Sequence, residues 1–434
     1  MISPFTITAK LPKRWNQTSD LLKSPLTLGR KENRLKAGRK PLHWGQFFYF
    51  SLERMAKTLL YVLDYYLPHK GGVETVFEQI ISRSLQEGYE VIVLTSHYDP
   101  QLPKEEKSWR FRIIRVGKSR KSFIWSGFWK GIQILKTSPE IFAIHTSTYW
   151  GAIPASLLGM LFHKPVLLTV HEIFWKLRNR YKLRKIARIY RFFEWLIFQL
   201  PFQSYHCVSV YTLNSLRLVY GIGDEKLFLA YNGVDYEFWD REKVSQQESL
   251  AVQEKFWLKG KRNLLYFGHT GISKGIDTLV EAIPEILALD PEIQLIFNFI
   301  PAQRERFIRE KIQTFLVDLP VSARGRVKIW NGLAKEELRA LVANVQGVVA
   351  PSLSEGFGSV HTETLALGTP LITTQIASLP EVVGGNVLFF APWSVTELVT
   401  AVKKLKTEDY QPLAERKFSW DEQYTALLKW YKQV

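Results

Sequence analysis

Cysteine is nearly absent from this chain of 434 residues, which contains only Cys207. One cysteine excludes a framework of disulfides within the chain and favours a reducing compartment, so we expect a cytoplasmic protein. Long apolar runs are also missing, because no segment reaches the roughly 18 apolar residues of a membrane-spanning helix. The best candidate, 149–162, contains Pro154 and is followed by His163 and Lys164. The N-terminus has no apolar stretch after its basic residues, which argues against a secretory signal.

Acidic residues are scarce relative to basic ones, and the net charge is +17. Residues 1–57 carry 12 Lys and Arg against 3 Asp and Glu. Such an excess of positive charge is typical of proteins that bind nucleic acid, an anionic membrane surface or an anionic substrate. It is equally typical of a solvated basic tail. Because 1–56 is polar, turn-rich and without periodicity, we expect a disordered extension. Met55 lies just before the first clear strand and is a conceivable start of the native protein.

Metal-binding patterns are missing as well. No Asp-x-Asp pair occurs in the chain, and no His or Cys cluster has ligand spacing. We therefore expect neither a metal nor another cofactor. The phosphate-binding P-loop pattern is not matched, which gives no support to nucleotide hydrolysis of that class. A basic nucleic-acid-binding protein stays an alternative, although the chain has no recognised RNA-binding module and we expect no nucleic-acid partner.

Short apolar strands alternate with helical patterns from residue 57 onward, which indicates parallel sheets with crossover helices. In the first half we expect a helix over 73–87 and strands at 58–63, 89–95, 111–116, 141–145, 166–170 and 205–210. In the second half we expect a helix over 276–287 and strands at 263–268, 293–298, 327–330, 347–350 and 371–374. The pattern predicts two doubly wound, Rossmann-like domains whose strand C-termini open onto one cleft.

The expected boundaries follow from these patterns. After the extension 1–56, we expect an N-terminal Rossmann-like domain over 57–235 and a charged linker over 236–262. A C-terminal Rossmann-like domain then covers 263–410, and residues 411–434 form a final helix that crosses back to the N-terminal domain.

Glu355 and Glu363 are separated by seven residues and lie in an informative context. A buried strand precedes them, and Gly356 and Gly358 allow a tight loop whose backbone can approach a ligand closely. A short helix follows from Ser359 and ends before Gly368. A helix N-terminus between two carboxylates offers free N–H groups to a phosphate. This element therefore predicts a site for a sugar joined to phosphate.

Three further strand ends carry residues suited to such a site. Gly268, His269 and Lys274 lie in a glycine-containing turn before a helix, where the lysine can meet a diphosphate. Gly71 and Gly72 lie in a similar turn, and His171 with Glu172 ends an apolar strand. Each feature taken alone is also consistent with an ordinary turn or a structural histidine.

Together these motifs resemble the GT-B glycosyltransferases of retaining family 4, over roughly residues 58–434. The resemblance rests on their order and on three further stretches. The matching residues are Gly71-Gly72, His171, 231–235, Lys274-Gly275, 355–363, 379–383 and 418–421.

The resemblance implies roles for individual residues. Glu363 binds the ribose, Glu355 and the backbone of Gly356, Phe357 and Gly358 hold the donor sugar, and Ser359 begins the phosphate-binding helix. Lys274 stabilises the leaving diphosphate, and His171 contacts the sugar. Gly268 and His269 belong to the diphosphate turn, Trp330 and Asn331 lie along the base, and Gly71 and Gly72 serve the acceptor or a phosphate. We therefore expect a retaining, metal-independent hexosyltransferase that uses a nucleotide-sugar donor and a glycan or lipid-linked acceptor in polysaccharide biosynthesis.

Two features qualify this interpretation. The family places arginine where this chain has His269, so either Lys274, helix dipole and loop amides carry more of the phosphate charge, or His269 is protonated when donor binds. Residues 176–202 are first basic and then aromatic, which is typical both of a helix on an anionic membrane and of a helix packed on the sheet. Other GT-B activities, a sugar phosphorylase or a nucleotide-sugar epimerase, remain alternatives.

Overall fold

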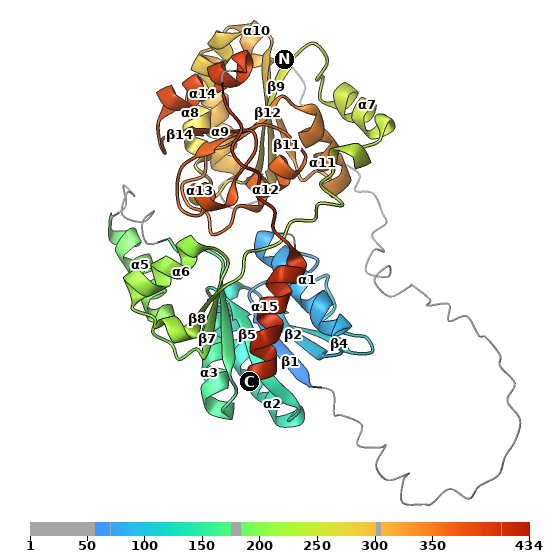
Figure 1. Ribbon diagram of the computed structural model, residues 1–434, viewed down its shortest axis with the longest axis vertical. Coiled ribbons are helices and arrows are strands. Elements are labelled where there is room, and N and C mark those ends of the chain that lie inside the picture. The colour runs from blue at the N-terminus through green and yellow to red at the C-terminus, as the bar shows by residue number, and fades with distance from the viewer. Residues whose placement is uncertain (1–56, 70, 175–183, 301–304, 409) are drawn as a thin grey trace, which may run out of the picture. The chain divides into compact units, whose positions relative to one another are not determined.

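The computed structural model describes residues 57–69, 71–174, 184–300, 305–408 and 410–434 (Figure 1). The predicted extension 1–56 and the basic residues 176–183 lie outside this range. The remaining chain forms two separate sheets in sequence order, each flanked by helices. The two-sheet α/β class expected from the sequence is therefore confirmed.

The first sheet contains eight strands in the order β3-β4-β2-β1-β5-β6-β7-β8. All neighbours are parallel except β3, which pairs antiparallel with β4 at the edge. Its strands are β1 (Thr58–Leu63), β2 (Glu90–Ser96), β3 (Glu105–Lys107), β4 (Phe111–Val116), β5 (Ile141–Ser147), β6 (Val166–Val170), β7 (Ser204–Cys207) and β8 (Leu227–Leu229). Its helices are α1 (Gly72–Gln86), α2 (Arg120–Thr137), α3 (Ala152–Phe162), α5 (Arg184–Phe198), α6 (Val210–Tyr220) and the short η2 (Asp224–Lys226).

Alternating side chains bury both faces of this sheet. Leu60 and Val62 face a core shared with α2, α3, α5 and α6. Leu59 and Tyr61 face the opposite core, which α1 closes together with the last helix of the chain. Burial on both faces explains why the inner strands β1 and β6 are apolar along nearly their whole length.

The second sheet contains six parallel strands in the order β11-β10-β9-β12-β13-β14. These are β9 (Arg262–His269), β10 (Ile293–Ile300), β11 (Val327–Asn331), β12 (Gly347–Ala350), β13 (Leu371–Thr374) and β14 (Val387–Phe390). Its helices are α7 (Gln246–Lys255), α8 (Ile276–Leu289), α9 (Glu305–Val317), α10 (Val321–Arg324), α11 (Lys335–Asn344), α12 (Ser359–Ala366), α13 (Leu379–Val382) and α14 (Val395–Thr407), with short turns η3 (Arg241–Lys243) and η4 (Ile272–Lys274).

Strand order reverses between β9 and β12, because β10 and β11 continue on one side and β13 and β14 on the other. In sheets of this kind ligands bind beyond the carboxyl ends of the strands at such a switch point. The loops that follow β9 and β12 are the two glycine-containing segments selected from the sequence. The strand order therefore brings them side by side.

The stretch 236–262, expected to be a linker, contains regular structure. Helix α7 packs against α11, and Trp239, Val252 and Phe256 are buried in the second sheet's core. Ser245 caps α7 through a capping box with Glu248. The charged composition hid this helix because most of its side chains face solvent.

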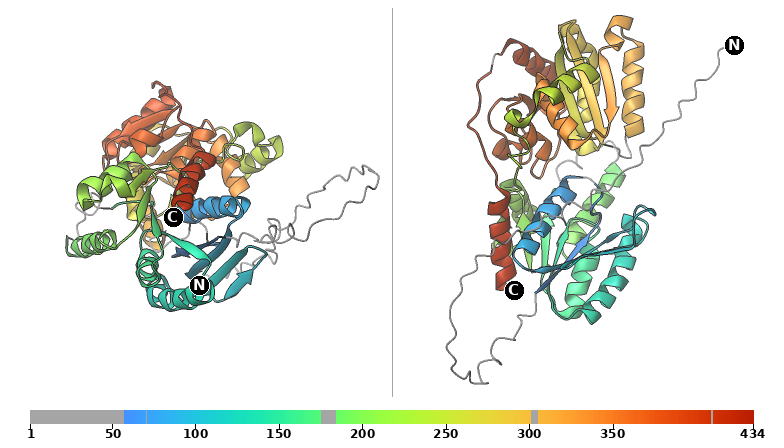
Figure 2. Two further views of the ribbon diagram at one scale, coloured as in Figure 1. Left: turned by 60° about the horizontal axis from the view of Figure 1, so that its bottom comes forward. Right: turned by 90° about the vertical axis from the view of Figure 1, so that its right-hand side faces the viewer.

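The last helix, α15 (Trp420–Gln433), packs beside α1 although the two are far apart in sequence (Figures 1 and 2). Leu427, Trp430 and Tyr431 are buried in the core of the first sheet. The Tyr431 hydroxyl lies 2.6 Å from His145 Nδ1 and 3.1 Å from the Tyr61 hydroxyl. Helix α15 is thus bound to the first sheet by a buried polar network as well as by apolar packing.

Most predicted strands agree with the observed ones to within two residues, and the helix 276–287 corresponds to α8. The strand expected at 205–210 is too long, because Ser209 caps α6 in a capping box with Thr212 and turns the chain into a helix. No helix within the described residues is both long and apolar enough to cross a bilayer.

Candidate functional site

The loop after β12 and the turn after β9 are packed backbone to backbone. The amides of Leu353 and Ser354 donate to the Ser273 carbonyl at 2.6 and 3.2 Å. A Cβ atom on Gly275 would lie 1.9 Å from the Pro351 carbonyl oxygen, so only glycine fits there. Gly275 also has φ +60°, a left-handed value that glycine adopts without strain. These contacts fix the position of Lys274 relative to the acidic loop.

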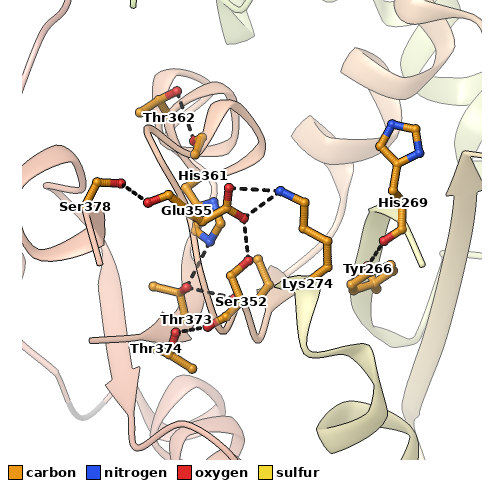
Figure 3. A network of polar contacts seen from close by, with 12 residues as sticks. Tyr266, His269, Lys274, Ser352, Glu355, His361, Thr362, Thr373, Thr374 and Ser378 are labelled. Carbon is orange, nitrogen blue, oxygen red and sulfur yellow. Dashed lines mark hydrogen bonds and ion pairs between the residues drawn. The ribbon is translucent and has the colours of Figure 1, made fainter. Parts of the chain in front are cut away.

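Lys274 and Glu355 form an ion pair across these two segments (Figure 3). The Lys274 Nζ lies 2.8 and 2.9 Å from the two Glu355 oxygens, and the Ser352 hydroxyl donates to Glu355 Oε1 at 2.6 Å. The Ser378 hydroxyl donates to the Glu355 backbone carbonyl at 3.0 Å. Glu355 is therefore held at both its side chain and its main chain.

Electrostatics keep this pair ionised. Burial alone raises the pKa of Glu355, but the Lys274 ammonium reverses this effect and the net pKa is lowered. For Lys274, burial acts to lower the pKa, but Glu355 and Glu172 reverse it and the net pKa is raised. Lys274 therefore carries a full positive charge, and its side chain is 27% exposed and accessible to an anion.

Helix α12 begins shortly after Glu355 in the chain, and the N-terminus of α1 lies next to that of α12. Gly358, with φ +89°, is the N-cap of α12, and Gly71 is the N-cap of α1. A Cβ atom on Gly72 would lie 4.0 Å from the Ser359 hydroxyl, so the first residues of α1 and α12 are adjacent. Free N–H groups at both ends attract an anion.

His171 lies at the end of β6 and contacts the acidic loop. A Cβ atom on Gly356 would lie 1.4 Å from the His171 carbonyl oxygen, which shows how closely the two backbones approach. Burial lowers the pKa of His171 to about 3, so its ring is neutral. Its Nε2 is buried and has no hydrogen-bond partner within the described residues. It is therefore available to a hydroxyl group of a ligand.

Gly268 and His269 end β9, and Gly268 has φ +136°. Burial, followed by the charge of Lys274, lowers the pKa of His269. The ring points away from the Lys274–Glu355 pair, while the His269 carbonyl accepts a hydrogen bond from Tyr266 (Figure 3). The His269 ring is thus neutral in the free protein.

The remaining predicted residues lie on α12, on β11 and in the acidic loop. Glu363 lies on α12, and burial raises its pKa to about 7, opposed by Lys335. Trp330 and Asn331 end the edge strand β11, and the Trp330 ring packs 4.8 Å from Phe256. The Phe357 side chain is buried against Phe418, so Phe357 presents only its backbone to a ligand. The structure thus brings Lys274, Glu355 and His171 together, and it places Trp330 and Asn331 on the edge strand β11.

The sequence did not single out the residues that support the loop, Ser352 and Ser378. Their role depends on contacts with Glu355, and isolated serines give no signal in a sequence. In the sequence Glu172 stands out only as the neighbour of His171, but in the structure it lies within electrostatic range of both Lys274 and Glu355. Among the described residues, no group of His, Cys, Asp or Glu side chains has the arrangement of a metal site.

Chemically, the site offers one partly exposed lysine, two helix N-termini and a carboxylate held in place. The cations and amides suit a diphosphate, and the carboxylate with His171 suits the hydroxyl groups of a sugar. The arrangement can therefore bind a sugar diphosphate and stabilise charge on a departing phosphate.

Comparison with known proteins identifies the family of this chain. Residues 70–238 match the model of Glycosyltransferase Family 4, and residues 261–408 match that of Glycosyl transferases group 1. An uncharacterized glycosyltransferase of Methanocaldococcus jannaschii is 23% identical over 386 residues, covering 81% of this chain and 91% of that protein. The mannosylfructose-phosphate synthase of Agrobacterium fabrum is 23% identical over 374 residues, covering 78% of this chain and 79% of that protein.

A solved structure shares the fold. HepE of Anabaena, in complex with UDP and glucose, superposes with a TM-score of 0.66 at 14% identity, covering 87% of this chain and 100% of that chain. Fold and site together define a glycosyltransferase of the GT-B class. The chain belongs to glycosyltransferase family 4, the glycosyl transferases group 1, and transfers a sugar from a nucleotide-sugar.

Proposed function

We propose that this protein is a retaining, metal-independent hexosyltransferase that transfers a sugar from a nucleoside-diphosphate sugar to a glycan or lipid-linked acceptor. The observation that carries the proposal is the Lys274–Glu355 pair beside the adjacent N-termini of α1 and α12. This arrangement supplies positive charge where a diphosphate leaves and a carboxylate where sugar hydroxyls bind. The HepE complex with UDP and glucose is consistent with a ligand of this class in this fold.

Transfer proceeds by front-face displacement in this proposal. The bond from the anomeric carbon to the diphosphate oxygen breaks as the acceptor oxygen bonds to the same face of that carbon. The acceptor's proton passes to the departing phosphate, so no protein nucleophile is needed. Lys274 and the helix N-termini stabilise the phosphate charge, and Glu355 and His171 position the sugar.

The roles of the other residues follow the family pattern. We assign Glu363 to the ribose, the turn at Gly268 and His269 to the diphosphate, and Trp330 with Asn331 to the base. Gly71 and Gly72 serve the acceptor or a phosphate. The boundaries expected from the sequence, an acceptor domain at 57–235 and a donor domain at 263–410, are proposed on the same basis.

Apolar side chains on α5 support a lipid-linked acceptor. Ile189, Phe192, Trp195 and Leu196 are 68, 63, 44 and 43% exposed, and Arg188 is exposed beside them. Aromatic and basic side chains together suit the interface of an anionic membrane. We therefore propose a peripheral membrane contact through the described part of 176–202, at the cytoplasmic face.

A thermal-shift screen of UDP-, ADP- and GDP-sugars tests the donor. A sugar nucleotide that binds only the folded protein raises its midpoint of unfolding. Lys274→Ala and Glu363→Ala should abolish the shift, whereas Glu225→Gln, an exposed residue of η2, should leave it unchanged. The assignment of the site is wrong if both site variants keep the full shift.

An assay of the reaction products distinguishes a transferase from a sugar phosphorylase. Release of free nucleoside diphosphate on adding acceptor indicates transfer. Turnover that requires inorganic phosphate, with no nucleotide released, would instead indicate a phosphorylase.

A further inference from the structure

Glu172 is the second residue after β6, and its backbone is held from two sides. The Tyr149 hydroxyl donates to the Glu172 carbonyl at 2.7 Å. On the other side, a Cβ atom on Gly356 would lie 3.3 Å from the Glu172 Cα. Glu172 therefore lies at the junction between β6 and the acidic loop that holds Glu355.

Three buried polar atoms near this junction have no hydrogen-bond partner within the described residues. They are His171 Nε2, Glu172 Oε1 and Ser354 Oγ. Ser354 lies close enough to Glu172 to affect its ionisation, although the two make no well-formed hydrogen bond. Folded proteins rarely leave buried polar atoms unpaired, so the neighbouring Glu172 Oε1 and Ser354 Oγ indicate a polar ligand that completes them.

The charges around Glu172 disfavour its ionised form. Two contacts of the Lys274 ammonium are already made with Glu355. The other charged or titratable groups that face it are Glu355, Glu194 on α5, the neutral His171 and Tyr211 on α6. Glu194 is itself occupied by the hydroxyls of Tyr149 and Tyr220. A second buried carboxylate beside Glu355 would lack a partner.

Burial is the main cause that raises the pKa of Glu172, to about 8, with Lys274 opposing and Glu355 adding to the rise. At neutral pH the side chain is therefore a carboxylic acid. A carboxylic acid can donate a hydrogen bond, whereas a carboxylate can only accept one and repels a phosphate.

We propose that Glu172 binds the sugar nucleotide as a neutral acid and donates a hydrogen bond to an oxygen of its sugar–diphosphate group. This inference rests on the proposed function, because it concerns the same donor. It adds a neutral hydrogen-bond donor to a site in which the Lys274–Glu355 ion pair supplies the charge. The affinity for donor then depends on a proton that this carboxyl must keep.

Isothermal titration with UDP-, ADP- or GDP-glucose, whichever binds most tightly, tests the proposal at pH 7 and pH 9. The wild-type dissociation constant should rise about tenfold, because a group with a pKa near 8 is mostly ionised at pH 9. Glu172→Gln, which stays neutral and still donates, should show less than about a twofold change. Glu172→Ala should bind about tenfold more weakly at both pH values.

Glu225→Gln is the matched control and should keep the wild-type dependence on pH. A tenfold loss of affinity in Glu172→Gln between pH 7 and 9 would overturn the proposal, because another group would then titrate. Equal affinity of Glu172→Gln and Glu172→Ala at pH 7 would also overturn it. Absence of binding in the wild type would instead overturn the proposed donor, and this inference with it.

Chemical denaturation provides an independent measurement. The folded protein keeps a proton on Glu172 up to about pH 8, whereas in the unfolded chain the carboxyl has its ordinary pKa of 4.5. Wild-type stability from this group is therefore present at low pH and is lost as pH rises toward 8. Glu172→Gln should have a higher midpoint than the wild type at pH 8, and an equal or lower midpoint would contradict a neutral Glu172.

Discussion

Lys274 and Glu355 hold each other in place before any ligand binds. The two residues are 81 positions apart in the sequence, and the Lys274 Nζ lies 2.8 and 2.9 Å from the two carboxylate oxygens of Glu355. The sequence predicted that each residue belongs to a sugar-phosphate site, because each lies in a glycine-containing segment after a strand. It could not predict the ion pair, since that depends on how the turn after β9 packs on the loop after β12.

Lys274 and the two helix N-termini bear on whether sugar transfer requires a metal ion. The positive charge of Lys274 and the amides of two helix N-termini can meet the charge of a leaving diphosphate. We therefore expect turnover to persist in excess EDTA, with less than about a twofold loss in rate. The measurement is release of nucleoside diphosphate with and without chelator. Loss of turnover that added Mg²⁺ or Mn²⁺ restores would contradict metal-independent transfer.

His269 has the opposite electrostatic character. Burial and Lys274 lower its pKa, so its ring is neutral in the free protein. The sequence left two alternatives for this position, and protonation on donor binding stays a prediction.

The acidic loop between β12 and α12 is held by close contacts with the neighbouring backbone. Gly356 contacts the backbone at His171, and Gly358 adopts the left-handed conformation that starts α12. The sequence indicated a close backbone approach to a ligand at these glycines. The structure shows that Gly356 approaches the end of β6, and the approach of this loop to a ligand stays a prediction.

Substitution of Gly356 tests this contact. In Gly356→Ala the new methyl group would lie 1.4 Å from the His171 carbonyl oxygen, so one backbone must move. We expect a loss of about 1–3 kcal/mol in unfolding free energy, measured by denaturant titration. Donor affinity should also fall at least about tenfold, because His171 and Glu355 are displaced together.

Gly325→Ala is the matched control, because nothing lies within 4 Å of its added Cβ. Its φ of −62° suits alanine, so its stability should stay within about 1 kcal/mol of the wild type. Equal effects of the two substitutions would contradict the close contact at Gly356.

Within the molecule described from residue 57 onward, the chain's last helix returns to the first sheet. Tyr431 joins Tyr61 and His145 in a buried network, and His145 continues it to Thr169 at 2.7 Å. The Glu381 carboxylate, on α13, accepts hydrogen bonds from the amides of Val210 and Tyr211 at the start of α6. These contacts connect elements of the two sheets at points distant in sequence.

Attachment of the molecule to a membrane is testable through α5. Phe192 and Trp195, whose rings stack 5.8 Å apart, are the exposed aromatic pair on this helix. We expect the wild type to sediment with vesicles that contain anionic lipid and to be released at high salt. Phe192→Glu with Trp195→Glu should reduce the bound fraction at least about threefold, because the apolar contact is lost.

Leu250→Glu is the control, since Leu250 is 57% exposed on α7. Equal sedimentation of all three proteins, or binding to neutral vesicles alone, would contradict a contact of α5 with anionic lipid.

The sequence by itself determined the α/β class, the positions of most strands and the segments that carry Lys274, His171, Glu355 and Glu363. It could do so because apolar runs, glycines and their order along the chain are local properties. Only the tertiary structure decided that Lys274 and Glu355 form a pair, that the starts of α1 and α12 are adjacent, and that Glu172 lacks a partner for a buried oxygen. Such facts depend on which strands lie side by side at the switch point, and on burial, which sets the charge of each group.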